Sequence, residues 1–223
     1  MGILANQSWR VHFALRALWC WRHCRNWREI LSFMRHEGPL ERIVLRDESV
    51  IYLDNGQASF DIFLCVWRRR EYAIGGYHVP SAGVVVDVGA NVGIFSVWAS
   101  RHLVPKGQVY AFEPVPATFE FLQRAAGASP RKNIRPFCKA VMDVPGRIRV
   151  WVGDESGHST VAAGNSADPG GEAVVDAEAT TLEAALATIP AGRIDLLKLD
   201  CEGSEYPILS ATPAAVFERV GAI

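Results

Sequence analysis

Short apolar runs alternate with longer helix-forming stretches through the middle and end of the chain. The apolar runs cover residues 84–87, 109–113, 134–140 and 195–200, and helical patterns cover residues 92–102 and 117–126. Thr180 or Thr181 is placed to cap a further helix through residue 187. Buried strands separated by helices of this length are typical of a parallel sheet with helices on both faces and right-handed crossovers. The pattern therefore predicts an α/β fold with a Rossmann-like sheet.

Three further segments interrupt this alternation. Residues 146–152 and 172–175 are predicted as extra strands around a flexible loop at 153–171 that is rich in Gly, Ser and Asp. Residues 220–223 form the start of one more predicted strand, at the end of the sequence. A strand left without a neighbour at that edge would expose its backbone N–H and C=O groups to another chain.

The first 80 residues have a different pattern, which divides the chain into three segments. Residues 8–36 contain no Gly or Pro, so they predict one helix that Ser8 caps and that Gly38-Pro39 ends. Residues 41–54 predict a β-hairpin, and residues 60–72 predict a helix. We therefore expect an Arg/Trp-rich helix at 1–39, a flanking hairpin and helix at 40–80, and the main domain at 81–223.

Arginine is concentrated in the predicted N-terminal helix. Residues 1–36 hold six arginines and one acid, Glu29. At the helical spacing, Arg10, Arg25, Arg28 and Arg35 fall within an arc of about 80°. Arginine and tryptophan together suit the interface of an anionic membrane, so one interpretation is peripheral membrane contact through residues 8–36. The other is a helix that packs on the main domain or on a partner subunit.

The composition argues against several other classes of protein. The net charge of -1 gives no surplus of Lys and Arg for a nucleic-acid partner. The five cysteines have neither disulfide-framework nor zinc-site spacing, so we predict packing roles, a reducing compartment and no metal. No secretory signal is recognisable, and no uninterrupted apolar stretch reaches the roughly 18 residues of a spanning helix. We expect a cytoplasmic protein, with peripheral contact at the membrane surface as the open alternative.

The candidate binding loop lies where the strand at 84–87 meets the helix from residue 92. Gly89 and Gly93 allow a sharp bend and the close approach of a ligand, outside the carboxyl ends of the strands. A dinucleotide fingerprint would have a glycine at the place of Asn91. Asp87 adds a negative charge before the loop, which repels a pyrophosphate and attracts a cation. S-adenosylmethionine carries such charge on its sulfonium and ammonium groups.

A second acid follows at the end of the next predicted strand. Glu113 lies twenty residues beyond Gly93 (113 minus 93). An acid at that place can accept hydrogen bonds from both hydroxyls of a ribose. Because Asp87 and Glu113 end adjacent strands and a glycine loop joins them, the pair is more specific than a glycine pattern alone. The sequence therefore predicts a cradle for a positively charged nucleoside.

Three blocks of sequence together resemble one family. They are residues 87–96 (DVGANVGIFS), 111–114 (AFEP) and 195–205 (DLLKLDCEGSE). The chain is similar to the FkbM family of methyltransferases over roughly residues 43–223. The resemblance implies a class I methyltransferase fold and methyl transfer from S-adenosylmethionine, usually to oxygen on natural products, sugars or glycolipids. By position it implies cofactor binding by Asp87, Gly89, Ala90, Asn91, Gly93, Glu113 and Asp200, with Asp200 beside the methyl group.

Methyl transfer to an alcohol requires a base that removes the hydroxyl proton. The candidates are Asp200, Glu202 and His158, with Lys198 as an orienting or charge-stabilising group. His158 lies on a predicted loop that is able to close over the pocket. Cys201 is predicted to pack rather than to act as a nucleophile, because no paired His is identifiable and methyl transfer needs no covalent intermediate.

Three functions stay open on this reading. The first is O-methylation of a hydroxyl on a small molecule, a sugar or a glycolipid. The second is a truncated, non-catalytic relic or binding module of the same fold, because FkbM members normally add a final antiparallel pair of strands that is apparently missing here. The third is an NAD-dependent oxidoreductase, against which the absent middle glycine counts. The sequence identifies neither the methyl acceptor nor the oligomeric state.

Overall fold

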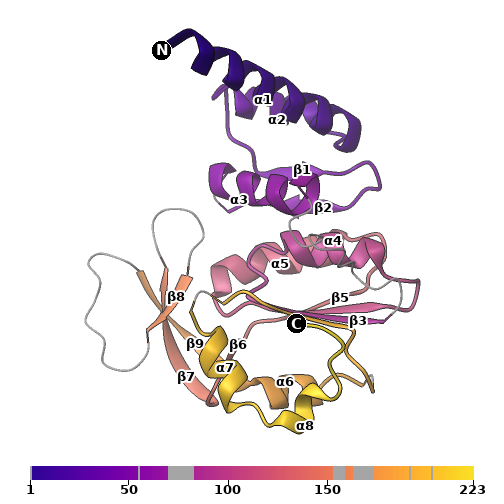
Figure 1. Cartoon of the computed structure of the whole chain (residues 1–223), viewed down its shortest axis with the longest axis vertical. Helices are drawn as coiled ribbons and strands as arrows, with labels where there is room; N and C mark the ends of the chain where they lie inside the picture. Colours follow the sequence, from indigo (N-terminus) through magenta and orange to yellow (C-terminus); the bar gives the residue numbers. More distant parts are fainter. Residues whose placement is uncertain are drawn as a thin grey trace.

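A parallel sheet forms the centre of the computed structural model, which describes residues 2–54, 56–69, 83–152, 159–162, 173–190, 192–201 and 203–223. Its four strands stand in the order β10 (Leu196–Leu199), β3 (Val84–Val88), β4 (Gln108–Phe112) and β5 (Ile134–Phe137) (Figure 1). Each neighbouring pair is parallel. The predicted α/β fold with a Rossmann-like sheet is confirmed.

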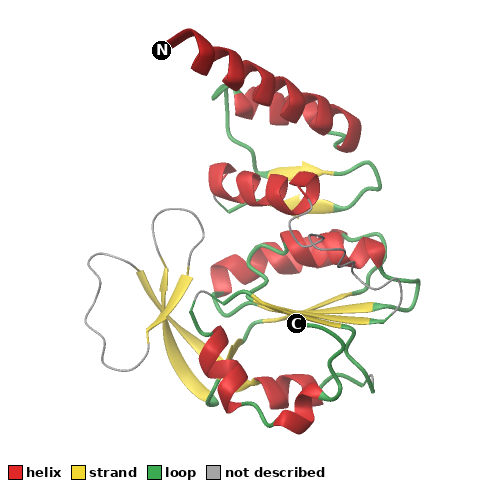
Figure 2. Ribbon diagram, viewed as in Figure 1, coloured by secondary structure: helices red, strands yellow, loops and turns green. Residues whose placement is uncertain are grey.

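Helices cover both faces of this sheet (Figure 2). One face carries α4 (Ile94–His102) and α5 (Pro116–Ala128), and the other carries α6 (Leu182–Ala187), α7 (Glu205–Ala211) and α8 (Ala214–Phe217). Successive strand residues point to opposite faces. Val85 and Val109 therefore belong to the core under α4 and α5, whereas Val86 and Tyr110 belong to the core over α6. Thr181 caps α6 as predicted, accepting a hydrogen bond from the Ala184 N–H at 3.2 Å.

A second sheet stands beside the first, with the strand order β6 (Ala140–Met142), β9 (Ala173–Thr181), β7 (Gly146–Val152) and β8 (Ser159–Ala162). Three predictions need correction here. The predicted strand at 134–140 is split between the two sheets, the predicted strand at 172–175 continues to Thr181, and the predicted loop at 153–171 contains strand β8. Antiparallel pairing of β7 with both β8 and β9 supplies the partners that local periodicity does not reveal.

The N-terminal part comprises α1 (Gly2–His23), α2 (Trp27–Met34), the hairpin of β1 (Arg42–Val44) and β2 (Val50–Tyr52), α3 (Gly56–Phe63) and the π-helical turn η1 (Leu64–Arg69). The predicted hairpin is confirmed. The helix predicted from residue 60 begins at Gly56, and residues 70–72 of that prediction lie outside the described residues.

The prediction of one helix over residues 8–36 is wrong. The helix begins before Ser8, so Ser8 lies inside α1 and not at its N-terminus, and the helix breaks between α1 and α2. At the break, Cys24 pairs with Leu45 of the hairpin, and the Arg25 N–H donates to the Val44 carbonyl at 2.7 Å. Tertiary pairing therefore overrides the helical preference of the sequence. The 80° arginine arc depended on one continuous helix and disappears with it.

The last residues lie beside β10. The Ile194 N–H donates to the Arg219 carbonyl at 2.7 Å, and the Leu197 N–H donates to the Ala222 carbonyl at 2.9 Å. Val220 forms a parallel bridge with Ile194, where the sequence predicted a further strand. Among the described residues, no helix has both the length and the apolar character needed to cross a membrane.

Candidate functional site

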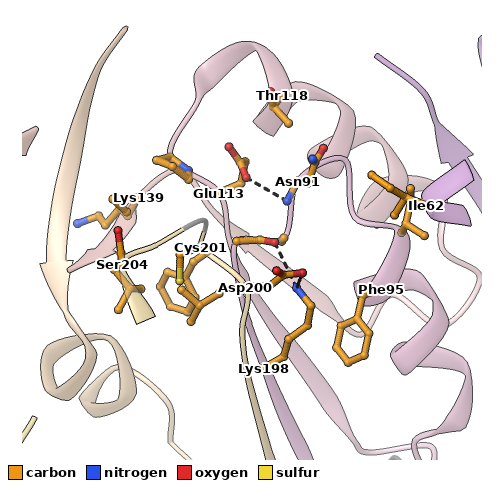
Figure 3. Close-up of a pocket in the computed structure, with 18 of the residues that line it drawn as sticks. Ile62, Asn91, Phe95, Glu113, Thr118, Lys139, Lys198, Asp200, Cys201 and Ser204 are labelled. Atoms are coloured by element: carbon orange, nitrogen blue, oxygen red, sulfur yellow. Dashed lines mark hydrogen bonds and ion pairs between the residues drawn. The ribbon is translucent and has the colours of Figure 1, made fainter. Parts of the chain in front are cut away.

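A cavity of about 380 Å³ opens at the carboxyl ends of β3, β4 and β10 (Figure 3). The second sheet and the α3–η1 segment complete its walls. Its lining residues are Asp61, Ile62, Cys65, Val66, Val88, Gly89, Ala90, Asn91, Ile94, Phe95, Phe112, Glu113, Pro114, Thr118, Lys139, Ala140, Val141, Met142, Val150, Lys198, Asp200, Cys201 and Ser204. The cavity is thus where parallel α/β sheets bind ligands, outside the carboxyl edge of the strands.

The loop between β3 and α4 folds tightly over the end of β4. The backbone N–H groups of Gly89 and Ala90 both donate to the Phe112 carbonyl, at 3.1 and 2.9 Å. The φ angles of Gly89, Asn91 and Gly93 are 75°, 51° and 89°. Glycine adopts this left-handed region freely, and asparagine tolerates it better than most residues. Asn91 can therefore replace a glycine in the turn and present its side chain at the cavity.

Both glycines of this loop are also required by packing inside the protein. A Cβ atom on Gly89 would lie 1.9 Å from the backbone oxygen of Asp200, and one on Gly93 would lie 2.8 Å from Leu122 Cδ1. Gly89 therefore lets the loop contact the chain that follows β10, and Gly93 lets α5 approach. The sequence predicted a sharp bend and the approach of a ligand at these glycines, but not these two internal contacts.

Glu113 follows β4 and is buried at the cavity. Its Oε2 accepts a hydrogen bond from the Asn91 N–H, and its Oε1 accepts one from the Val115 N–H, both at 3.0 Å. Burial raises the pKa of Glu113 to about 7, the two backbone hydrogen bonds oppose this rise, and the negative charge of Asp87 adds to it. The carboxylate is thus held in a fixed orientation, with lone pairs left for a ligand.

Asp87 and Lys198 form a buried ion pair beneath the loop. Lys198 Nζ lies 3.0 Å from Asp87 Oδ1 and 3.2 Å from Asp200 Oδ2, and Ser96 Oγ donates to Asp87 Oδ2 at 2.6 Å. Lys198 Nζ also lies 5.4 Å from the centre of the Phe95 ring. The register of β10 on β3 pairs Lys198 with Asp87, so adjacent strands place the ammonium next to the acid.

The three charged groups leave a negative charge at the cavity. Two carboxylates and one ammonium sum to −1, and the side chain of Asp200 is 57% exposed whereas that of Asp87 is fully buried. Lys198 is buried and is closest to Asp87, so Asp200 presents most of the unbalanced charge. A cationic ligand at this end of the cavity is therefore favoured over an anionic one.

Comparison with known proteins supports a methyltransferase. The family model described as the methyltransferase FkbM domain matches residues 87–220. The chain belongs to the FkbM methyltransferase family. The match begins at Asp87 and includes Glu113, Lys198 and Asp200, so these charged residues all lie inside the matched domain.

Three curated relatives are also methyltransferases by name. Methyltransferase sdnD of Sordaria araneosa is 28% identical over 64% of this chain and 65% of its own length. Methyltransferase 1 of Beauveria bassiana (strain ARSEF 2860) is 31% identical over 38% of this chain and 34% of its own length. The 31-O-demethyl-FK506 methyltransferase FkbM of Streptomyces tacrolimicus is 37% identical over 35% of this chain and 29% of its own length. The matched part of the chain thus spans less than two thirds of each relative.

The residues predicted for the FkbM site fall into three groups. Gly89, Ala90, Asn91, Glu113, Lys198 and Asp200 line the cavity together. Asp87 and Gly93 lie behind its wall, where Asp87 binds Lys198 and Ser96 and Gly93 begins α4. Glu202 and His158 lie outside the described residues. Among the residues that the structure describes, no group of three or more His, Cys, Asp or Glu side chains is arranged to hold a metal ion.

Cys201 lies on the cavity wall but is poorly suited to nucleophilic attack. Burial raises the pKa of its thiol to about 12, and the negative charge of Glu205 adds to the rise. The thiol is therefore protonated near neutral pH. Glu205 organises this segment, because its carboxylate accepts hydrogen bonds from the N–H groups of Cys201 at 2.7 Å and Gly203 at 2.9 Å.

One wall of the cavity was not anticipated from the sequence. Asp61 and Ile62 of α3, with Cys65 and Val66 of η1, line it from outside the span that the FkbM model matches. π-Helical turns are rare and often occur at functional sites. No local motif indicates this role, because tertiary packing, including that of η1 on α4, brings the segment to the cavity.

Proposed function

We propose that this FkbM family member transfers a methyl group from S-adenosylmethionine to a hydroxyl oxygen of a small molecule, sugar or glycolipid. The observation that carries the proposal is that Glu113 and Asp200 line the same cavity. The left-handed turn at Gly89 lines the cavity with them. The Streptomyces tacrolimicus relative is named as a 31-O-demethyl-FK506 methyltransferase, and this name supports an oxygen acceptor.

The described residues fit a cationic nucleoside donor. Glu113 is held by two backbone N–H groups, so its remaining lone pairs can accept hydrogen bonds from both ribose hydroxyls. The apolar wall of Val141, Met142 and Val150 suits the flat face of an adenine. The net negative charge at Asp200 suits a sulfonium. When bound, the donor would supply an activated methyl group on its sulfonium, and alignment of the acceptor with that carbon would lower the barrier to displacement.

Asp200 is the group that we assign to the acceptor proton. Its carboxylate is exposed in the cavity and is 3.2 Å from Lys198 Nζ, which fixes its position. As the acceptor oxygen bonds to the methyl carbon, the bond between that carbon and sulfur would break, the neutral thioether would leave, and Asp200 would take the hydroxyl proton. Lys198 limits the build-up of negative charge while the hydroxyl gives up its proton. The proton then leaves to water, since Asp200 is half exposed.

The α3–η1 wall is the part of the cavity that we assign to the acceptor. Ile62 and Val66 present apolar surface, and Asp61 adds a carboxylate at the same rim. Asp61 is oriented by Gln57, whose side-chain amide donates to it at 2.8 Å. Acceptor choice would then depend on residues outside the part of the chain that matches the family domain.

Calorimetric titration tests the proposed donor. We expect S-adenosylmethionine to bind and NAD not to bind, because the loop lacks the middle glycine and faces net negative charge. Replacing Glu113→Gln should weaken binding by about tenfold or more, since one charge-assisted hydrogen bond contributes roughly 1.5–3 kcal/mol. The matched control is Glu120→Gln on the exposed side of α5. Binding of NAD in preference to S-adenosylmethionine would refute the proposal.

A labelled-methyl assay tests the proposed reaction. The full chain is incubated with methyl-labelled S-adenosylmethionine and a metabolite and lipid extract, and the labelled products are identified by mass spectrometry. Label on an ether oxygen is the expected result. Label on nitrogen, carbon or sulfur would exclude the proposed acceptor chemistry. The variant Ile62→Trp should change which products are labelled while leaving the affinity for S-adenosylmethionine within about twofold, because an added side chain in one wall is felt mainly by the ligand that contacts it.

A further inference from the structure

The outer face of α1 carries an exposed apolar row. Val11, Leu15 and Leu18 follow the helical spacing of four and three residues and are 57%, 47% and 59% exposed, and Trp21 beside them is 52% exposed. Soluble monomers rarely leave large apolar side chains together in water without a binding function. We call this row, with the flanking Arg10 and Arg22, the outer face of α1.

The opposite side of α1 packs against the rest of the protein. Cys20 is buried, the Trp19 ring lies 5.7 Å from the Phe63 ring, and Arg16 pairs with Asp61 of α3 at 3.6 Å. Figure 1 shows α1 at the end of the long axis of the molecule, farthest from the parallel sheet. The outer face is therefore apolar for a reason other than the fold.

The charges around this face all have one sign. Residues 2–28 contain no Asp or Glu. Arg22 lies one turn after Leu18 in the same row, and Arg10 lies beside its start; both are exposed. Apolar side chains with tryptophan and flanking arginines are the composition of helices that lie in the plane of an anionic membrane surface.

We propose that the outer face of α1 binds an anionic lipid surface, with Val11, Leu15, Leu18 and Trp21 inserted at the headgroup boundary and Arg10 and Arg22 at the phosphates. A second copy of this chain suits the face less well. Around a two-fold axis the same patch meets itself, so the arginines of one copy would approach those of the other.

This surface is smaller than the one indicated by the sequence. Arg25 pairs with Glu48 at 3.1 Å, and the guanidinium of Arg28 lies 5.3 Å from the centre of the Trp27 ring. Both residues lie at or beyond the break between α1 and α2. The membrane contact is therefore assigned to the outer face of α1 and not to residues 8–36 as a whole.

Vesicle flotation of the full chain tests the proposal. Vesicles of phosphatidylcholine alone are compared with vesicles of phosphatidylcholine and phosphatidylserine. We expect the chain to float with the anionic vesicles and the double variant Leu15→Glu/Leu18→Glu to stay behind. Arg10→Gln/Arg22→Gln should weaken the partitioning by about fivefold per arginine, and added salt should weaken wild-type partitioning. Val144→Glu, at an exposed apolar residue between β6 and β7, is the matched control and should float like the wild type.

Two results would overturn the inference. One is wild-type protein that stays with the soluble fraction in the presence of anionic vesicles. The other is a wild-type dimer, seen by analytical ultracentrifugation without lipid, that Leu15→Glu/Leu18→Glu converts to monomer, since that would assign the face to a second copy. Circular dichroism of each variant establishes that helix content is retained, and calorimetry with S-adenosylmethionine reports separately on the cavity.

Discussion

Lys198 Nζ lies 3.0 Å from Asp87 Oδ1, and both side chains are buried although the residues are 111 positions apart. The pair joins β10 to β3 at the base of the cavity. Asp200, two residues after Lys198, extends this charge system to the cavity surface. Because the register of β10 on β3 places Lys198 beside Asp87, Lys198 contacts both the buried acid Asp87 and the exposed acid Asp200, which we assign to catalysis.

Removal of the Lys198 ammonium should destabilise the fold. Lys198→Met leaves the carboxylate of Asp87 buried without this counter-charge, and breaking such a pair costs about 3–5 kcal/mol. The double variant Asp87→Asn/Lys198→Met removes both charges and should recover a large part of that loss. Urea unfolding measures the free energy of unfolding of the single and the double variant. The control Lys139→Met breaks an exposed pair with Glu178 and should cost at most about 1 kcal/mol. Equal losses in the single and double variants would show that the pair is not coupled.

Replacement of the exposed acid should separate activity from stability. Asp200→Asn keeps the shape of the side chain, and its 57% exposure predicts a stability change below about 1 kcal/mol. Turnover should fall by roughly a hundredfold or more, because a positioned base typically contributes that much. The labelled-methyl assay gives the rate, and thermal unfolding gives the stability. Asp176→Asn, at an exposed acid on β9, should change neither. Unchanged turnover of Asp200→Asn would refute its role as base.

Glu113 should make stability depend on pH. Burial raises its pKa from an ordinary value of 4.5 to about 7. Between these two values the folded chain binds more protons than the unfolded chain, so the free energy of unfolding decreases as the pH rises. The contribution is fully present below pH 4.5 and is lost as the pH passes about 7. Urea unfolding across this range should show wild type losing stability relative to Glu113→Gln as the pH rises, because Gln resembles the protonated acid and does not titrate. Glu120→Gln is the control, and the difference in free energy of unfolding between it and wild type should stay constant over the same pH range.

Two glycines should respond oppositely to the same substitution. Gly89→Ala places a Cβ atom 1.9 Å from the Asp200 carbonyl at a φ of +75°, so the loop must move away from the chain after β10. We expect a loss of about 1–3 kcal/mol and weaker binding of S-adenosylmethionine. Gly127→Ala, inside α5 with no atom within 4 Å of the new Cβ, should stabilise by about 0.5–1 kcal/mol. Thermal unfolding with calorimetric titration checks both. Tolerance of Gly89→Ala without loss would contradict the packing role of this glycine.

The strand-loop-helix unit at the centre of the site could be predicted from the sequence alone. Apolar runs fix the parallel strands, and Gly89, Asn91 and Gly93 mark the turn, because each of these signals depends on neighbours in the chain. The end of β4 likewise placed Glu113 on the cavity, since carboxyl ends of parallel strands meet at one edge. Membership of the FkbM family agrees with this local reading.

Tertiary structure alone decided the rest of the site. The Lys198 partner of Asp87, the contact of Gly89 with Asp200 and the α3–η1 wall each join residues that are remote in the chain. The break at Cys24 has the same origin, because hydrogen bonds to the hairpin outweigh a helical preference of a few tenths of a kcal/mol per residue. Local preferences are small and follow from neighbouring residues, whereas buried charge pairs and strand pairings acquire their energy only when the whole chain brings them together.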